Sequence, residues 1–210
     1  FQLLGRYNDL HIYGPSGLER FIQFYKDNFN YGEDFKINLH IVGTKGMKKI
    51  LDHEKVEVFS FPLKHRIETL GYLFREKPVD LNLKKEALDI YKPSIEEVVQ
   101  IKKGKDLRLF GGEIIPNHEL TFPPWKTRSY AYCSDTGYSE KIINYVRGVD
   151  LLYHEATFSE NDKELARETM HSTSKDAASI ASKAKVQRLL IGHFSSRYKE
   201  NEFLEEEARE

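Results

Sequence analysis

Three predicted strands in the last third of the chain end abruptly in a residue that can bind a metal or move a proton. Each strand is a short apolar run, and the residues at or just after the three ends are Asp135, Glu155 and His193. In layered α/β folds such strand ends converge at one edge of the sheet, where ligands bind. Asp135 alone can be a turn cap and His193 alone a hydrogen-bonded core histidine. Their equivalent positions nevertheless predict that the three are neighbours in one site.

A second candidate element is the run His171-Ser172-Thr173, which directly precedes a predicted Ala-rich helix over 174–184. Free backbone N–H groups and the positive end of a helix favour an anion such as phosphate at this position. Ser172 and Thr173 can also cap the helix, and the two roles can coexist. His171 has no comparable structural explanation.

Metal binding is the chemistry that these residue types favour. His65 follows another predicted strand, and together His65, Asp135 and His193 supply nitrogen and oxygen ligands suited to Zn²⁺ or a similar ion. A carboxylate can bridge two such ions, which would activate water and stabilise the oxygens of a displacement at phosphorus. Three ligands, however, cannot hold two metals well.

Apolar periodicity predicts the elements that position these residues. It indicates strands at 10–13, 36–42, 56–61, 68–75, 128–133, 149–153 and 187–191, and helices at 18–25, 139–147, 162–168 and 174–184. Repeated strand-then-helix alternation implies a layered α/β sheet covered by helices. The acidic run Glu205-Glu206-Glu207 near the end is typical of a solvated helix or tail.

The segment 76–119 interrupts this order, because its apolar periodicity weakens and proline and glycine punctuate it. It is predicted to be an arm inserted into a single domain that spans 1–210. Four of its basic residues face only Asp106 locally: Lys102, Lys103, Lys105 and Arg108. Such a run is either a solvated surface or a contact to a phosphate backbone.

Length and composition exclude several classes of protein. The chain has 210 residues, 32 Lys+Arg against 33 Asp+Glu, and 40% hydrophobic residues, which fits one globular domain rather than a disordered chain. It has no apolar run of the roughly 18 residues that a membrane helix needs and no secretory signal segment. The single Cys133, expected to be a buried small residue, suits a reducing cytosol, so we predict a cytoplasmic protein.

Four segments in fixed order resemble one known family. Asp135-Thr136 after a strand, then His-Glu-Ala-Thr at 154–157, then His-Ser-Thr at 171–173, then His-Phe-Ser-Ser-Arg-Tyr at 193–198 resemble ribonuclease Z of the metallo-β-lactamase superfamily. The resemblance spans nearly the whole chain. It implies an αββα sandwich, a homodimer, and zinc-dependent endonucleolytic removal of the 3′ trailer from precursor tRNA, with two zinc ions in a complete site.

The same resemblance implies roles for individual residues. His65 and His193 would be metal ligands and Asp135 the carboxylate that bridges the metals. Glu155 and His171 would pass a proton to the leaving 3′ oxygen, since an alkoxide leaving group needs a general acid.

Phosphate would be bound by Arg197, whose guanidinium is planar and always charged, beside Ser172 and Thr173. The stretch Lys102-Lys103-Gly104-Lys105 resembles the basic stem of the family's tRNA-grasping arm.

Two features depart from the family pattern. The His-x-His-x-Asp-His motif, which supplies most of the first metal site, should lie upstream of Phe1 to Leu10 and is absent from these residues. The chain also begins without methionine, so we expect an N-terminally incomplete fragment with little or no activity by itself. In the arm, Tyr91-Lys92-Pro93-Ser94 stands where the family usually has a Gly-Pro tip.

Two other functions remain open at this point. One is another hydrolase of the same superfamily, a phosphodiesterase or an arylsulfatase-like enzyme that acts on small esters. The other is a non-catalytic fragment that binds RNA or dimerises. The inserted arm and the His-Ser-Thr segment favour RNA as the substrate.

Overall fold

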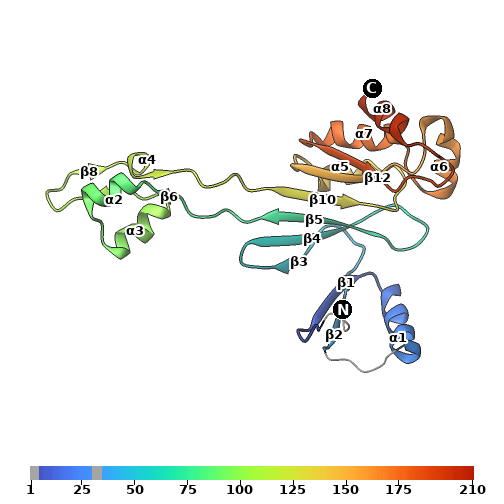
Figure 1. The fold of residues 1–210 in the computed structure, drawn as a ribbon, viewed down its shortest axis with the longest axis horizontal. Coiled ribbons are helices and arrows are strands. Elements are labelled where there is room, and N and C mark those ends of the chain that lie inside the picture. The colour runs from blue at the N-terminus through green and yellow to red at the C-terminus, as the bar shows by residue number, and fades with distance from the viewer. Residues whose placement is uncertain (1–4, 30–34) are drawn as a thin grey trace. The chain divides into compact units, whose positions relative to one another are not determined.

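The computed structural model describes residues 5–29 and 35–210, which form two compact units (Figure 1). Unit 1 combines Phe1–Glu76 with Arg128–Glu210, and unit 2 is Lys77–Thr127. Unit 2 extends past residue 119, where the sequence pattern placed the end of the arm. None of the helices in the described ranges is long and apolar enough to cross a membrane.

Unit 1 is organised around a six-stranded sheet of order β12-β11-β10-β5-β4-β3. These strands are β3 (Lys48–Asp52), β4 (Val56–Pro62), β5 (Leu70–Glu76), β10 (Ser129–Cys133), β11 (Leu151–Glu155) and β12 (Leu189–Gly192). Strands β10, β11 and β12 are parallel, whereas β3, β4, β5 and β10 pair antiparallel. The predicted mixed α/β fold is therefore confirmed, and the parallel strands end at one edge of the sheet, as the sequence pattern required.

Strand β3 is the element of this sheet that the sequence pattern missed. Its residues are Lys-Lys-Ile-Leu-Asp, and Ile50 is the one position of the five that is not exposed. An edge strand that is solvated on both faces has no alternation of apolar and polar residues, so periodicity cannot detect it.

Short helices complete unit 1: α5 (Lys141–Tyr145), α6 (Lys163–Thr169), α7 (Ser174–Ala184) and α8 (Glu202–Arg209) (Figure 1). Helix α7 has the predicted bounds because Thr173 and Asp176 form a capping box at its start. Its small buried residues Ala177, Ala181 and Ala184 let it pack closely on the core. That core contains Phe61, Leu73, Ala131, Leu152 and Ile180 among its fully buried side chains.

The acidic C-terminal segment was expected to be a solvated helix or tail, and a helix is observed, with Glu205 and Glu206 exposed. It forms α8, and Leu204 on this helix is fully buried. Glu207 accepts hydrogen bonds from the Ser174 hydroxyl (2.5 Å) and from the backbone N–H of Glu160 (3.0 Å). The acidic residue therefore meets the positive N-terminal end of α7, where a carboxylate is favoured.

The N-terminal part of unit 1 forms β1 (Leu10–Gly14), α1 (Gly17–Phe29) and β2 (Ile37–Ile41), with β1 and β2 parallel. All three elements were predicted. The apolar face of α1 is not buried among the described residues, however: Phe21 is 64% exposed and Tyr25 is 54% exposed.

Unit 2 contains α2 (Lys85–Tyr91), α3 (Ile95–Lys102), α4 (Asn117–Leu120), and the short strand pairs β6–β9 (Asn82–Leu83 with Thr121–Phe122) and β7–β8 (Leu107–Arg108 with Ile114–Ile115). It has its own small core of Ala87, Ile101, Leu107, Ile115 and Leu120. A complete capping box between Ser94 and Glu97 begins α3. Its core and its strand pairs therefore form within one continuous segment of the chain.

Candidate active site

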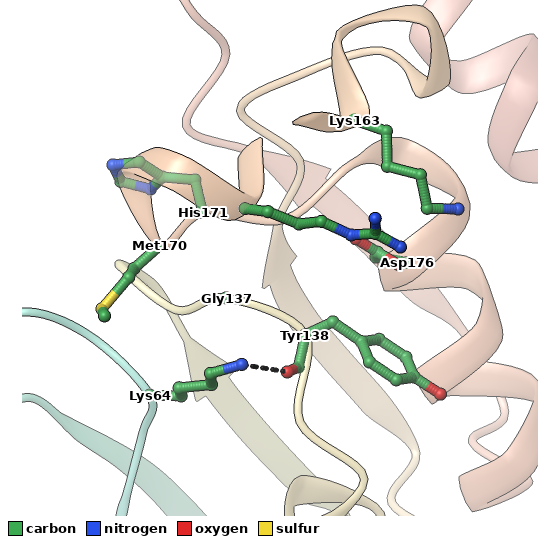
Figure 2. A pocket seen from close by; sticks show the side chains of 8 residues that line it. Lys64, Gly137, Tyr138, Lys163, Met170, His171 and Asp176 are labelled. Carbon is green, nitrogen blue, oxygen red and sulfur yellow. Dashed lines mark hydrogen bonds between the residues drawn. The ribbon is translucent and has the colours of Figure 1, made fainter. Parts of the chain in front are cut away.

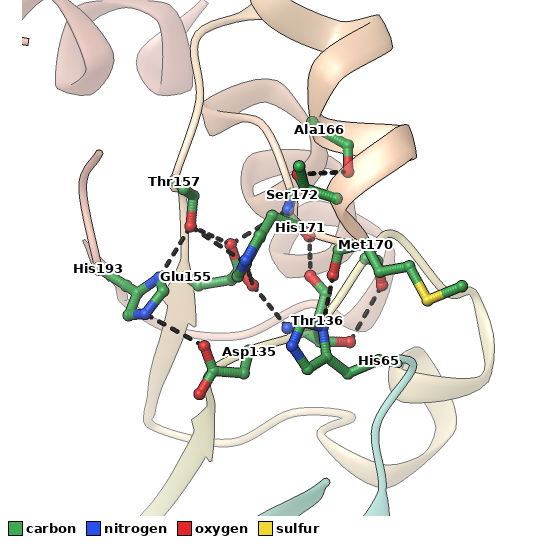
Figure 3. Close-up of polar contacts among 12 residues, drawn as sticks. His65, Asp135, Thr136, Glu155, Thr157, Ala166, Met170, His171, Ser172 and His193 are labelled. Carbon is green, nitrogen blue, oxygen red and sulfur yellow. Dashed lines mark hydrogen bonds and ion pairs between the residues drawn. The ribbon is translucent and has the colours of Figure 1, made fainter. Parts of the chain in front are cut away.

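The five residues that the sequence singled out for metal binding and proton transfer lie together (Figure 3). His65 follows β4, Asp135 follows β10, Glu155 ends β11, His171 precedes α7, and His193 follows β12. Cys133 pairs with His154 and Glu155 with Gly192 in the parallel ladder, which brings the three strand ends level. The predicted convergence at the sheet edge is thus observed.

Asp135 and His193 adopt left-handed backbone conformations, with φ of 55° and 63°. Such conformations cost a non-glycine residue about 1–3 kcal/mol and persist where the surroundings impose them, often at functional sites. Here they direct the two side chains toward one another, and His193 Nε2 lies 3.1 Å from Asp135 Oδ1.

Glu155 is fully buried, and both of its carboxylate oxygens are occupied. Its Oε1 accepts hydrogen bonds from the backbone N–H of Thr136 (2.5 Å) and from His171 Nδ1 (2.8 Å). Its Oε2 accepts hydrogen bonds from the Thr157 hydroxyl (2.5 Å) and from the backbone N–H of Ser172 (3.1 Å). A buried carboxylate is tolerated when it is paired in this way. Glu155 is therefore built to orient His171, and the Nε2 atom of His171 is left for a metal or a substrate.

Thr157 connects this carboxylate to His193. Its single hydroxyl proton is donated to Glu155, so the contact of 2.8 Å with His193 Nδ1 requires that Nδ1 carry the proton. In the neutral imidazole the Nε2 lone pair then faces the Asp135 carboxylate, an arrangement that calls for a cation between them.

His65 is oriented by the backbone. Its Nδ1 lies 3.1 Å from the carbonyl oxygen of Met170, and a carbonyl only accepts, so Nδ1 carries the proton. The lone pair of Nε2 is then available. A histidine that donates one N–H to a carbonyl while the other nitrogen is free is the usual form of a metal ligand.

Two groups of three potential ligands have donor atoms within 4.8 Å of one another among the described residues: His65 with Asp135 and His171, and Glu155 with His171 and His193. The second group is the poorer candidate for a metal site, because four hydrogen bonds already occupy the Glu155 carboxylate. Imidazole nitrogens and the Asp135 carboxylate suit a zinc-like divalent ion. These donors fit one ion and fall short of two complete coordination shells.

Ser172 and Thr173, predicted to touch phosphate, are both fully buried. The Ser172 hydroxyl donates to the carbonyl of Thr136 (2.6 Å), and the Thr173 hydroxyl caps α7 and donates to Glu160 (3.0 Å). Their evident role is to hold the His171 loop in place, and phosphate contact by these side chains stays a prediction.

Arg197 lies at the border of the site. Its guanidinium carbon is 5.1 Å from the ring centroid of Phe158, and Phe158 in turn packs edge-on against His171 at 6.2 Å between centroids. Its Nη1 is 3.6 Å from Asp162. The side chain is 44% exposed, which leaves the charge accessible.

Three more residues next to the site are described by the structure. Thr157 belongs to the His-Glu-Ala-Thr segment but received no role from the sequence, although its spacing of two residues from Glu155 was a usable signal. His154 is fully buried, burial lowers its pKa, and its Nδ1 contacts the Glu155 carbonyl at 2.7 Å. Cys133 is fully buried as predicted, and burial raises the pKa of its thiol, which opposes reactivity.

The three lysines predicted to contact RNA belong to unit 2. Lys102 is the last residue of α3, Lys103 is its C-cap, and Lys105 follows Gly104, whose φ of 92° requires glycine. Lys103 and Lys105 are exposed and Lys102 is half-buried.

Solved structures identify the fold. The fold matches Bacillus subtilis YhfI, a metallo-β-lactamase fold protein, with a TM-score of 0.59 and 16% identity over 99% of this chain and 61% of that one. It matches the short form of human tRNase Z with a TM-score of 0.60 and 23% identity, over 90% of this chain and 61% of that one. The chain therefore has the metallo-β-lactamase fold.

Sequence relatives define the family. The chain is 44% identical over 207 residues to ribonuclease Z of Porphyromonas gingivalis, which covers 99% of this chain and 68% of that protein. Ribonuclease Z of Parabacteroides distasonis is 42% identical over 206 residues, with 98% and 68% covered. No family model matches the chain. The chain belongs to the ribonuclease Z family, and it spans about two thirds of the length of these relatives.

Proposed function

We propose that the chain is the larger part of a zinc-dependent endoribonuclease that removes the 3′ trailer from precursor tRNA. Family membership supports this function, since the relatives are named ribonuclease Z. The observation that carries it is the buried Glu155–His171 pair beside the donors His65, Asp135 and His193. A carboxylate that holds an imidazole next to metal donors is suited to phosphodiester hydrolysis with a poor leaving group.

His171 has one ring nitrogen left for chemistry, so it can either bind the metal or donate a proton. We assign it the proton, because Glu155 holds its Nδ1 and stabilises the imidazolium from the buried side. The metal ligands would then be His65, Asp135 and His193, with the Asp135 carboxylate close to each of the two histidines. A bound divalent ion would supply an activated water and neutralise charge on the phosphate.

The proton from His171 Nε2 would go to the 3′ oxygen that leaves the tRNA. Arg197 would hold the phosphate from the exposed side, since its guanidinium lies beside Phe158 and Phe158 contacts His171. Lys102, Lys103 and Lys105 on unit 2 would contact the phosphate backbone of the tRNA. We further propose that the complete enzyme is a cytoplasmic homodimer with two zinc ions.

The test compares this chain with a version extended at its N-terminus to the full length of its relatives. We expect zinc binding and trailer cleavage by the extended protein, a sharp loss for Asp135→Ala or His193→Ala, and little or no cleavage by the 210-residue chain. If the extended protein hydrolyses small diesters but leaves precursor tRNA intact, a small-ester hydrolase is the better assignment. Binding of RNA without any hydrolysis would favour a non-catalytic role.

A further inference from the structure

A small cavity of about 250 Å³ lies next to the candidate site, and none of the roles assigned so far accounts for it (Figure 2). It is bounded by the loop after β4, by Gly137 and Tyr138 after β10, by α6, and by the start of α7. His171 also lines it. One residue therefore belongs both to the proton-transfer pair and to the cavity wall.

The lining is rich in cations. Lys64, Lys163 and Arg167 line the cavity, and Asp176 is its one acidic residue. The Asp176 carboxylate already accepts the backbone N–H of Thr173 (3.2 Å) in the capping box of α7. The cavity thus has a surplus of positive charge that an anionic ligand would match.

The partners of these cations do not prevent them from binding an anion. Arg167 Nη1 meets Glu164 at 2.9 Å in a pair whose side chains are 65% and 81% exposed. Lys163 pairs with Glu160 one turn away. The Arg167–Glu164 pair is exposed, and such pairs contribute little, so a phosphate in the cavity can compete for Arg167. The Lys163–Glu160 pair is less exposed, at 39% and 30%, but the Lys163 ammonium has three donors and can keep Glu160 while it meets a phosphate. Lys64 Nζ lies 3.5 Å from the carbonyl oxygen of Tyr138.

The remaining wall suits a flat ring. Tyr138 and Met170 line the cavity, and aromatic and thioether surfaces both pack well against a nucleobase. The Tyr138 hydroxyl accepts a hydrogen bond from Lys183 (2.8 Å) and donates one to Glu140 (3.1 Å), which holds the ring in a defined position. Ligand pockets usually measure about 300–1,000 Å³, so this cavity is sized for a single small unit.

We propose that this cavity binds one nucleotide of the RNA substrate next to the bond that is cut. Its phosphate would meet Lys64, Lys163 and Arg167, and its base would lie against Tyr138. The inference rests on the proposed function, because it takes RNA as the substrate. It adds a binding site beyond the metal donors, the Glu155–His171 pair and Arg197.

A binding experiment on the 210-residue chain tests the cavity without any catalysis. Adenosine 5′-monophosphate, inorganic phosphate and adenosine are titrated separately, and backbone NMR signals of Gly137 and Met170 are followed. We expect the nucleotide to shift these signals and to bind more tightly than phosphate or adenosine alone. Arg167→Ala should weaken nucleotide binding about fivefold or more, which is the lower end for loss of one such contact.

Arg209→Ala is the matched control, since Arg209 is also an exposed helical arginine paired with a glutamate on its own helix, Glu205. It does not line the cavity and should bind the nucleotide normally. Tyr138→Leu should weaken adenosine 5′-monophosphate but leave phosphate unchanged. The inference fails if the nucleotide leaves the Gly137 and Met170 signals unmoved, or if Arg167→Ala and Arg209→Ala behave alike.

Cleavage by the N-terminally extended protein provides the second readout. Arg167→Ala should raise KM for precursor tRNA about fivefold or more while kcat changes little. Cleavage with no difference between Arg167→Ala and Arg209→Ala would refute the cavity but leave the proposed function intact. Nucleotide binding in the cavity without any cleavage of precursor tRNA would refute the function instead.

The side of the cut bond is decided with abasic substrates. One precursor lacks the base of the last tRNA nucleotide and the other lacks the base of the first trailer nucleotide. If the missing base is the one that the cavity binds, KM for that abasic substrate should be the same for Tyr138→Leu and the unsubstituted protein. If both abasic substrates stay as sensitive to Tyr138→Leu as the intact precursor, no base lies against Tyr138.

Discussion

The candidate active site and the inserted unit 2 are built in opposite ways. The site collects side chains from strand ends and loops between His65 and His193, and its central carboxylate, Glu155, is fully buried. Unit 2 is one continuous segment, Lys77–Thr127, with short helices and a small core of its own. Its large apolar side chains Phe110 and Ile95 are fully or mostly exposed. The reactive atoms of the site are positioned by contacts between distant segments of the chain. A surface that binds a partner can instead be formed by one continuous segment.

The largest expected effect is the loss of Glu155. Glu155→Ala removes the acceptor of four hydrogen bonds in a buried place and should lower the free energy of unfolding by about 3–5 kcal/mol. Urea denaturation of the 210-residue chain measures this. Lys103→Ala on unit 2 is the control and should leave the unfolding midpoint unchanged. An equal midpoint for both variants would mean that the Glu155 network does not hold the site together.

Removal of unit 2 tests whether this unit binds tRNA without taking part in hydrolysis. Glu76 and Arg128 flank it, and the backbone N–H of Glu76 donates to the carbonyl of Arg128 at 2.9 Å, so a short Gly-Ser linker can join them. In the N-terminally extended protein we expect zinc binding and hydrolysis of a small diester to persist. Precursor tRNA binding should fall about tenfold or more, with a weaker dependence on salt, because phosphate contacts are lost.

Equal losses on the small diester and on precursor tRNA would contradict this division of labour and would indicate a folding defect instead. Circular dichroism of the shortened protein distinguishes the two outcomes.

Both regions contain non-glycine residues with a left-handed backbone conformation, so the same kind of substitution can be made in each. Asp135→Gly should relieve backbone strain and raise the free energy of unfolding of the metal-free chain by about 1 kcal/mol, while zinc affinity falls about tenfold or more. Lys92→Gly at the C-cap of α2 is the matched variant, with φ of 48°. It should gain similar stability without loss of zinc binding.

Urea denaturation with a chelator and zinc titration check both variants. Loss of zinc binding in Lys92→Gly would show that the two regions are coupled.

The smallest effect concerns the start of α3. Hydrogen bonds from the backbone N–H and hydroxyl of Ser94 lower the pKa of the Glu97 carboxyl. The pKa of Glu97 is lower in the folded than in the unfolded state, so the ionised carboxylate stabilises the fold. This stabilisation is complete above the ordinary glutamate pKa of about 4.3 and is lost as the pH falls through the pKa of the folded state. Ser94→Ala should raise the pKa of Glu97, which NMR titration of its side chain measures.

Ser94→Ala should also lower the free energy of unfolding at neutral pH by about 1 kcal/mol, because α3 loses its N-cap. The signals of Asp135 and His193 should stay in place. Changes there would contradict the local character of unit 2.

Local patterns predicted most elements of unit 1 but none of the short helices and strands of unit 2, and the exceptions have physical causes. Helix α7 was placed correctly because its cap and its alanines are properties of adjacent residues. Strand β3 was missed because an exposed edge strand has no apolar alternation. The C-terminal helix was expected to be solvated, and its acidic composition could not reveal that Glu207 would meet Ser174.

The metal and proton donors of this protein, and their order along the chain, can be read from the residues alone, and that order identifies the ribonuclease Z family. The tertiary structure decided which atoms remain free for chemistry. By residue type alone Glu155 could bind a metal or move a proton, whereas in the structure contacts from Thr136, Thr157 and Ser172 occupy its carboxylate oxygens. Hydrogen-bond partners of this kind come from segments far apart in the chain, so local residue patterns do not contain them.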